Sequence, residues 1–149
     1  MLSFNSKKFT ELTSVELYQI LALRANVFIV EQTCPYQDVD GKDLDALHLL
    51  GYKKDNLIAY GRILKKGVSY KNHCSIGRIV IDREYRGKNY GHDLVNYAIK
   101  TCYKHHPKQS IKISAQAHLE KFYIYHRFIP TGEKYLEDDI PHIGMVLKD

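Results

Sequence analysis

The chain has 149 residues, of which 44% are hydrophobic and 26% are charged, as is typical of a globular protein with one compact domain. No apolar run approaches the roughly 20 residues of a membrane-spanning helix, and the segment 1–5 lacks the basic and apolar regions of a secretory signal. We therefore expect one domain over residues 1–149, in the cytoplasm and without a membrane partner. The formal net charge of +5 indicates an anionic partner.

Charged residues cluster along the chain. Basic residues gather in segments 83–88 and 100–112, and acidic residues gather in segments 31–45 and 137–139. One interpretation is an ordinary solvated surface with chance clustering. The other is a site with two poles, a positive one for phosphates and a negative one for a cationic co-substrate.

Neither the cysteines nor the acidic residues form a metal-binding pattern. Cys34, Cys74 and Cys102 are odd in number, far apart in sequence and in no Cys-x-x-Cys pair, which indicates reduced thiols. A calcium loop that began at Asp38 would need an acid at its last position, where Leu49 stands. We therefore expect no metal.

The N-terminal third begins with alternating apolar and polar residues, which predict a short strand over residues 2–4. The sequence Thr13–Glu16 reads as a capping box, and the apolar spacing behind it predicts a helix over residues 14–28. Residues 35–45 begin with a proline and are acidic, so we expect a loop with room for a short second helix.

The rest of the chain predicts further strands and two helices. We expect strands at residues 47–52, 57–64, 75–81, 111–114, 129–135 and 142–147. A helix is expected from His92 to the proline at 107, and a shorter one over 119–126. Pro141 and the segment 138–139 are placed in the connection between the last two strands. The fold class is a mixed α/β domain.

The run Arg86–Gly91 lies between an apolar strand and the start of an amphipathic helix. Unpaired backbone N–H groups at a helix N-terminus and the helix macrodipole favour an anion there. Glycine lets the chain approach such a ligand closely, and Arg86 and Lys88 add full positive charges. This arrangement predicts a ligand that carries phosphates.

Two motifs are similar to those of a known family. The run Arg86–Gly91 matches the pattern Gln/Arg-x-x-Gly-x-Gly/Ala, and Gln116, Tyr123 and Phe128 have the spacing of a second block. In that block, Arg127 replaces the glycine that commonly precedes the phenylalanine. Together the motifs resemble the GNAT superfamily of acyl-CoA N-acetyltransferases.

Longer stretches resemble the ElaA-type branch of that superfamily. These stretches are residues 30–38, 115–119 and 140–145, and the resemblance covers nearly the whole chain. Asn89 departs from the pattern, because a glycine usually stands at this position. Asparagine is among the residues that best tolerate positive φ, so the turn can keep its conformation.

The resemblance implies a central, mostly antiparallel sheet that splays open between its fourth and fifth strands and is flanked by helices. Acetyl-CoA would enter this split, with its pantetheine arm against the backbone of Ile79 and Ile81 and its pyrophosphate on the amides of residues 87–91. Segment 79–81 also reads as an ordinary buried strand, and both interpretations hold at once. The expected acetyl-CoA-binding residues are Ile79, Val80, Ile81, Arg86, Gly87, Lys88, Asn89, Tyr90, Gly91 and Gln116.

Acetyl transfer to an amine requires an acid for the departing thiolate and a donor for the oxyanion. Tyr123 stands at the motif position for the acid, since a phenol remains protonated at neutral pH. It could instead pack beside Phe122 as an ordinary aromatic residue. The oxyanion donor is expected to be a backbone N–H near Val80.

The amine must also lose a proton, and several residues could accept it. Glu31, His48, His118 and His142 are candidates by residue type, and we rank Glu31 and His142 first. Each histidine could instead be structural, and Glu31 could hold the positive charge of the acceptor.

We therefore expect an acetyl-CoA-dependent N-acetyltransferase that acts on the primary amine of a cationic small molecule or peptide, as a monomer or homodimer. The alternative is a regulatory module that binds acyl-CoA without turnover. Nucleic-acid binding is not expected, because Glu84 and Asp93 interrupt the basic residues and no nucleic-acid motif is present.

Overall fold

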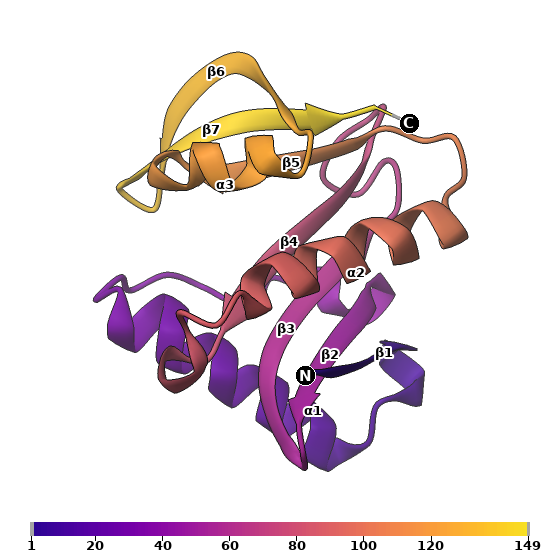
Figure 1. The fold of residues 1–149 in the computed structure, drawn as a ribbon, viewed down its shortest axis with the longest axis vertical. Helices are drawn as coiled ribbons and strands as arrows, with labels where there is room; N and C mark the ends of the chain where they lie inside the picture. Colours follow the sequence, from indigo (N-terminus) through magenta and orange to yellow (C-terminus); the bar gives the residue numbers. More distant parts are fainter. Residues whose placement is uncertain (1, 149) are drawn as a thin grey trace.

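A computed structural model describes residues 2–148 and contains one seven-stranded sheet, in the order β1-β2-β3-β4-β5-β7-β6 (Figure 1). The strands are β1 (Ser3–Lys8), β2 (Leu47–Lys53), β3 (Asn56–Leu64), β4 (Cys74–Ile81), β5 (Ile111–Gln116), β6 (Ile129–Glu137) and β7 (Ile140–Leu147). The helices are α1 (Ser14–Arg24), α2 (Tyr90–His105) and α3 (Glu120–Tyr125), with a π-helix at Ala25–Glu31 and short 3₁₀ helices at Phe9–Glu11, Lys42–Asp45, Arg83–Tyr85 and Ala117–Leu119.

The sheet splits between β4 and β5. These two strands are parallel and pair only through Cys74 with Ile111 and Ser75 with Lys112, whereas β5 pairs with β7 along its whole length. Beyond Ser75 the strands separate into a lower group, β1–β4, and an upper group, β5–β7 with α3 (Figure 1). The predicted mixed α/β fold with a splayed, mostly antiparallel sheet is confirmed. Among residues 2–148, no strand pairs with the β5-facing edge of β4 in the second half of that strand.

Helices α1 and α2 cover opposite faces of the lower strands. Ile20 of α1 packs in one core cluster with Leu50, whereas Val95 of α2 packs in another with Leu49. Leu49 and Leu50 are neighbours in β2, so their side chains point to opposite faces of the sheet. The crossover from β4 to β5 through α2 sets the helix N-terminus beside the split (Figure 1).

The first helix starts as predicted but does not end as predicted. The Glu16 N–H donates to Thr13 Oγ1 at 3.0 Å, and the Thr13 N–H donates to Glu16 Oε1 at 2.9 Å, which confirms the capping box. The α-helical hydrogen bonds stop at Arg24, and the chain continues as a π-helix to Glu31. π-Helical turns are rare in proteins, and those that occur often lie at functional sites.

One further detail differs from the expectations. Pro141 lies within β7, opposite Leu136, and the connection is the two-residue turn Asp138–Asp139, in which both residues have positive φ.

Cys74 and Cys102 are far apart in sequence, but their sulfur atoms are 3.2 Å apart as buried free thiols. None of the helices within residues 2–148 is both long and apolar enough to cross a membrane.

Candidate active site

A cleft of about 900 Å³ runs through the split between β4 and β5. Its walls come from the second half of β4, the β4–α2 turn, α3, the end of the π-helix and the β6–β7 turn. Tyr123, Glu31 and His142 all line it, as do all the expected acetyl-CoA-binding residues except Lys88. The structure thus brings together residues from segments that are far apart in sequence.

The β4–α2 turn has the backbone conformation of an anion-binding loop. Gly87 has φ +80° and Asn89 has φ +64°, so asparagine adopts the left-handed conformation expected at the usual glycine position. A Cβ atom built on Gly87 would meet no heavy atom within 4 Å, so its backbone is open to a ligand. Helix α2 starts directly afterwards at Tyr90, and its free N–H groups and dipole favour an anion.

Arg86 and Glu31 form an ion pair across the mouth of the cleft. The Arg86 guanidinium donates to Glu31 through both terminal nitrogens, with 3.0 Å between Nη2 and Oε1. Arg86 also donates to the Ile81 carbonyl from Nε at 3.1 Å and from Nη2 at 3.0 Å. The hydrogen bond from Arg86 lowers the pKa of Glu31, so this carboxylate is a weaker proton acceptor than an ordinary glutamate.

Tyr123 is buried at the cleft wall, with 9% of its surface exposed. Its ring packs edge-on against Phe122 and Phe128, with centroids 5.1 and 5.8 Å away. Within residues 2–148, no group forms a hydrogen bond with its hydroxyl. Burial raises the pKa of Tyr123 to about 12, so the phenol remains protonated near neutral pH. The residue is thus both a packed aromatic and a free donor beside the cleft.

Three of the four candidate bases line the cleft, and His48 does not. His48 is a fully buried residue of β2, and its ring bonds to the Tyr60 hydroxyl at 2.6 Å and to the Asp43 carbonyl at 2.8 Å. Burial lowers the pKa of His48, so it stays neutral as a structural residue. In contrast, His142 faces the cleft from β7.

The hydrogen bonds of His142 fix its tautomer. Nδ1 lies 2.7 Å from the Ile140 carbonyl oxygen, which can only accept, so Nδ1 carries the proton in the neutral ring. Nε2 then has a lone pair, and it lies 3.4 Å from Glu137 Oε2.

A β-bulge interrupts β4 next to the expected oxyanion donor. The pairing with β3 shifts between Gly77, opposite Arg62, and Val80, opposite Tyr60, and Arg78 between them has φ +50°. A bulge leaves a backbone group outside the regular ladder. Because no strand of the described part of the chain pairs with this edge of β4, N–H groups near Val80 are available to a carbonyl oxygen in the cleft.

The acidic segment before β2 does not supply the expected negative pole. Arg24 Nε lies 2.8 Å from Asp38, and its Nη1 lies 2.8 Å from Asp43. The complete network pairs three aspartates with three arginines: Asp38, Asp40 and Asp43 with Arg24, Arg62 and Arg78. These three carboxylates are already paired with arginines, and the six charges compensate one another in a largely buried cluster.

The network nevertheless shapes one wall of the cleft. The Tyr36 hydroxyl donates to Asp38 at 2.7 Å, and the Arg78 guanidinium lies 5.5 Å from the centre of the Tyr36 ring. Both Tyr36 and Arg78 line the cleft, and the sequence analysis singled out neither. The sequence signal for such a network is an arginine within an apolar segment, such as Arg62 in the strand at 57–64.

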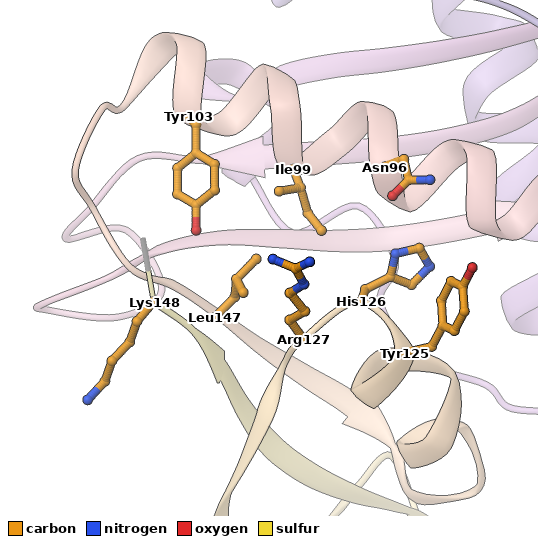
Figure 2. A pocket seen from close by; sticks show the side chains of 8 residues that line it. All are labelled: Asn96, Ile99, Tyr103, Tyr125, His126, Arg127, Leu147 and Lys148. Carbon is orange, nitrogen blue, oxygen red and sulfur yellow. The ribbon is translucent and has the colours of Figure 1, made fainter.

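A second, smaller hollow of about 500 Å³ lies between α2 and the ends of α3 and β7 (Figure 2). Figure 2 shows Arg127 and His126 pointing toward α2 across this hollow. The His126 ring is hydrogen-bonded at 2.9 Å to His92, which lines the main cleft. None of the predicted catalytic or acetyl-CoA-binding residues lines this hollow.

Comparison with known proteins identifies the family of this chain. Residues 21–148 match a family model described as acetyltransferase (GNAT) domain. The chain belongs to the GNAT acetyltransferase family.

Individual relatives support this assignment over the full length. The GNAT chain is 45% identical over 147 residues to protein ElaA of Escherichia coli, covering 97% of this chain and 95% of ElaA. The crystal structure of E. coli ElaA matches with a TM-score of 0.92 at 43% identity, over 99% of this chain and 100% of that one. An acyl-CoA N-acyltransferase from Pseudomonas aeruginosa matches with a TM-score of 0.92 at 42% identity, over 98% and 99% of the two chains. The resemblance to the ElaA-type GNAT branch is confirmed.

Proposed function

We propose that this GNAT protein transfers an acetyl group from acetyl-CoA to the primary amine of a cationic small molecule or peptide. The observation that carries the proposal is the cleft whose lining combines the β4–α2 turn, the β4 bulge and Tyr123. The first feature fits a pyrophosphate, the second a carbonyl oxygen and the third a departing thiolate.

The β4–α2 turn would hold the acetyl-CoA. Its left-handed Gly87 and Asn89 expose backbone N–H groups, and the α2 N-terminus adds its dipole. Arg86 is held at the Ile81 carbonyl and would add a charge to the phosphates, in competition with Glu31. The unpaired edge of β4 from Ile79 to Ile81 would accept the pantetheine arm as an added strand.

His142 is the base that the site favours over Glu31. The Glu31 carboxylate is engaged by Arg86 and has a lowered pKa, whereas His142 Nε2 has a lone pair directed away from its bonded carbonyl. The ammonium gives one proton to His142, and the neutral amine then attacks the thioester carbon. The new N–C bond forms first and gives a tetrahedral oxyanion, and the C–S bond breaks when this intermediate collapses.

Tyr123 would donate its proton to the departing sulfur. The second N–H proton of the amine then replaces the proton that Tyr123 has lost, so the phenol is restored at the end of the cycle. Backbone N–H groups near Val80 would stabilise the intermediate oxyanion. At the end of the cycle, the enzyme differs from its starting state only by the extra proton on His142, which is released to water.

The test is release of free thiol from acetyl-CoA in the presence of polyamines, amino acids, aminoglycosides and lysine peptides. The expected result is thiol release that depends on one amine class, with acetylated amine identified by mass spectrometry. Binding of CoA by calorimetry without turnover toward any amine in the panel would favour the acyl-CoA-binding module instead. Absence of CoA binding would refute both functions.

A further inference from the structure

Four side chains on β5, β6 and β7 form a polar cluster on the acceptor side of the cleft. They are Ser114, Tyr135, Glu137 and His142, and we call them the amine seat. Ser114 Oγ bonds to the Tyr135 hydroxyl and lies 3.2 Å from Glu137 Oε1. The Tyr135 and His142 rings stack with their centroids 6.2 Å apart and their planes 18° apart.

The hydrogen bonds of the seat leave two acceptors facing each other. His142 Nδ1 donates to the Ile140 carbonyl, so Nε2 of the neutral ring is an acceptor. Ser114 holds Glu137 by its Oε1 atom, and the other oxygen, Oε2, lies 3.4 Å from His142 Nε2. His142 is 8% exposed, so its lone pair has little access to water outside the cleft. Two acceptors in this position are stabilised by a donor that reaches both.

We propose that the seat binds the ammonium group of the acceptor, with Glu137 as the residue that selects a protonated primary amine. This rests on the proposed function and names the recognition element of its second substrate. An ammonium has three N–H donors, so it can donate to Glu137 Oε2 and to His142 Nε2 at once.

The seat also keeps its charge balanced through proton transfer. Before transfer, the positive charge is on the ammonium and the negative charge is on Glu137. After one N–H bond of the ammonium breaks and a proton joins His142 Nε2, the positive charge is on the imidazolium, still beside Glu137. Glu137 therefore compensates one positive charge in both states, and the neutral amine is left in place for attack.

The seat is distinct from the acidic residues that the structure neutralises elsewhere. Asp38, Asp40 and Asp43 are paired with arginines, and Glu31 is paired with Arg86. Glu137 has no arginine or lysine partner among residues 2–148, lines the cleft and has 48% of its side chain exposed.

Glu137→Gln is the test variant, because it keeps the shape and removes the charge. Glu133→Gln is the matched control, since Glu133 lies on the same strand, pairs with Lys112 at 2.8 Å and does not line the cleft. The probes are 1,4-diaminobutane and 2-phenylethylamine, each compared with the corresponding alcohol, in the presence of CoA. The readouts are calorimetric affinity and the NMR signal of the His142 ring, assigned by its loss in His142→Gln.

In the wild-type protein, at least one amine is expected to shift the His142 signal, and its alcohol is not. Glu137→Gln is expected to weaken amine binding about ten- to a hundredfold, as for loss of a charge-assisted hydrogen bond, while Glu133→Gln stays within about twofold. Equal affinity of Glu137→Gln and wild type, or no response of His142 to either amine, would overturn the seat. Amine binding without thiol release would leave the seat in place and refute acetyl transfer, so the two failures are separable.

Discussion

Replacing Tyr123 by phenylalanine should remove most of the turnover and little else. Proton donation to a leaving group contributes about 10²- to 10⁴-fold, which corresponds to about 2.7 to 5.4 kcal/mol of transition-state stabilisation. The hydroxyl has no hydrogen-bond partner within residues 2–148, so its loss should change the free energy of unfolding by less than about 1 kcal/mol. The expected result is a kcat lower by two orders of magnitude or more, with unchanged CoA affinity.

The assay compares kcat from thiol release, CoA affinity from calorimetry and unfolding in urea. Tyr125→Phe is the control, because Tyr125 is the next tyrosine on α3 and is 71% exposed outside the main cleft. With a pKa of about 12, Tyr123 stays protonated through the working range, so it should cause no alkaline fall in kcat below about pH 11. A kcat within about threefold of wild type, with a folded protein that binds CoA, would remove Tyr123 from the mechanism.

Three further changes test the charges around the cleft. Glu31→Gln removes the carboxylate that competes with phosphate for Arg86, so CoA affinity should rise up to about fivefold with little change in kcat. A hundredfold loss of kcat would instead identify Glu31 as the base. Burial opposes ionisation of Asp40, but hydrogen bonds from Arg62 lower its folded-state pKa below the unfolded value. The ionised Asp40 therefore stabilises the fold fully above about pH 5, and this contribution is lost as the pH falls. Urea unfolding from pH 6 to pH 3 should show a smaller loss of unfolding free energy in Asp40→Asn than in wild type. Arg24→Met removes one of the two arginine partners of Asp38 and of Asp43 and leaves the buried network with one negative charge in excess, so it should cost about 3–5 kcal/mol in urea unfolding; a cost below about 1 kcal/mol would contradict a tightly coupled network.

Local signals in the sequence predicted the parts of the site that depend on neighbouring residues. The capping box of Thr13 and Glu16 placed the start of α1, because both hydrogen bonds span only three residues. The left-handed Asn89 followed from the intrinsic tolerance of asparagine for positive φ. The split of the sheet followed from the family motifs rather than from strand propensity.

Long-range contacts account for what the sequence did not predict. The π-helix after Arg24 has no local signal in its apolar sequence, and its last residue meets Arg86, which is 55 positions away. Cys74 and Cys102 share no motif, yet a strand and a helix packed on it bring their sulfurs together. Residue type alone could not separate His48 from His142, because both rings are buried and only the folded structure shows that His142 lines the cleft.

The two-pole interpretation was based on charged residues counted along the sequence. In the folded protein, many of these charges are compensated by ion pairs, so only the charges left after pairing can attract a ligand. In the acidic segment, Asp38, Asp40 and Asp43 are cancelled by arginines that arrive from α1, β3 and β4. At the phosphate end, Arg86 is already opposed by Glu31. Within residues 2–148, the cleft carboxylates without an arginine or lysine partner lie at the β6–β7 turn, on Glu137 and the neighbouring aspartate. Acceptor choice should therefore follow this turn, and exchange of residues 135–142 between relatives should change which amine is used without changing the affinity for CoA.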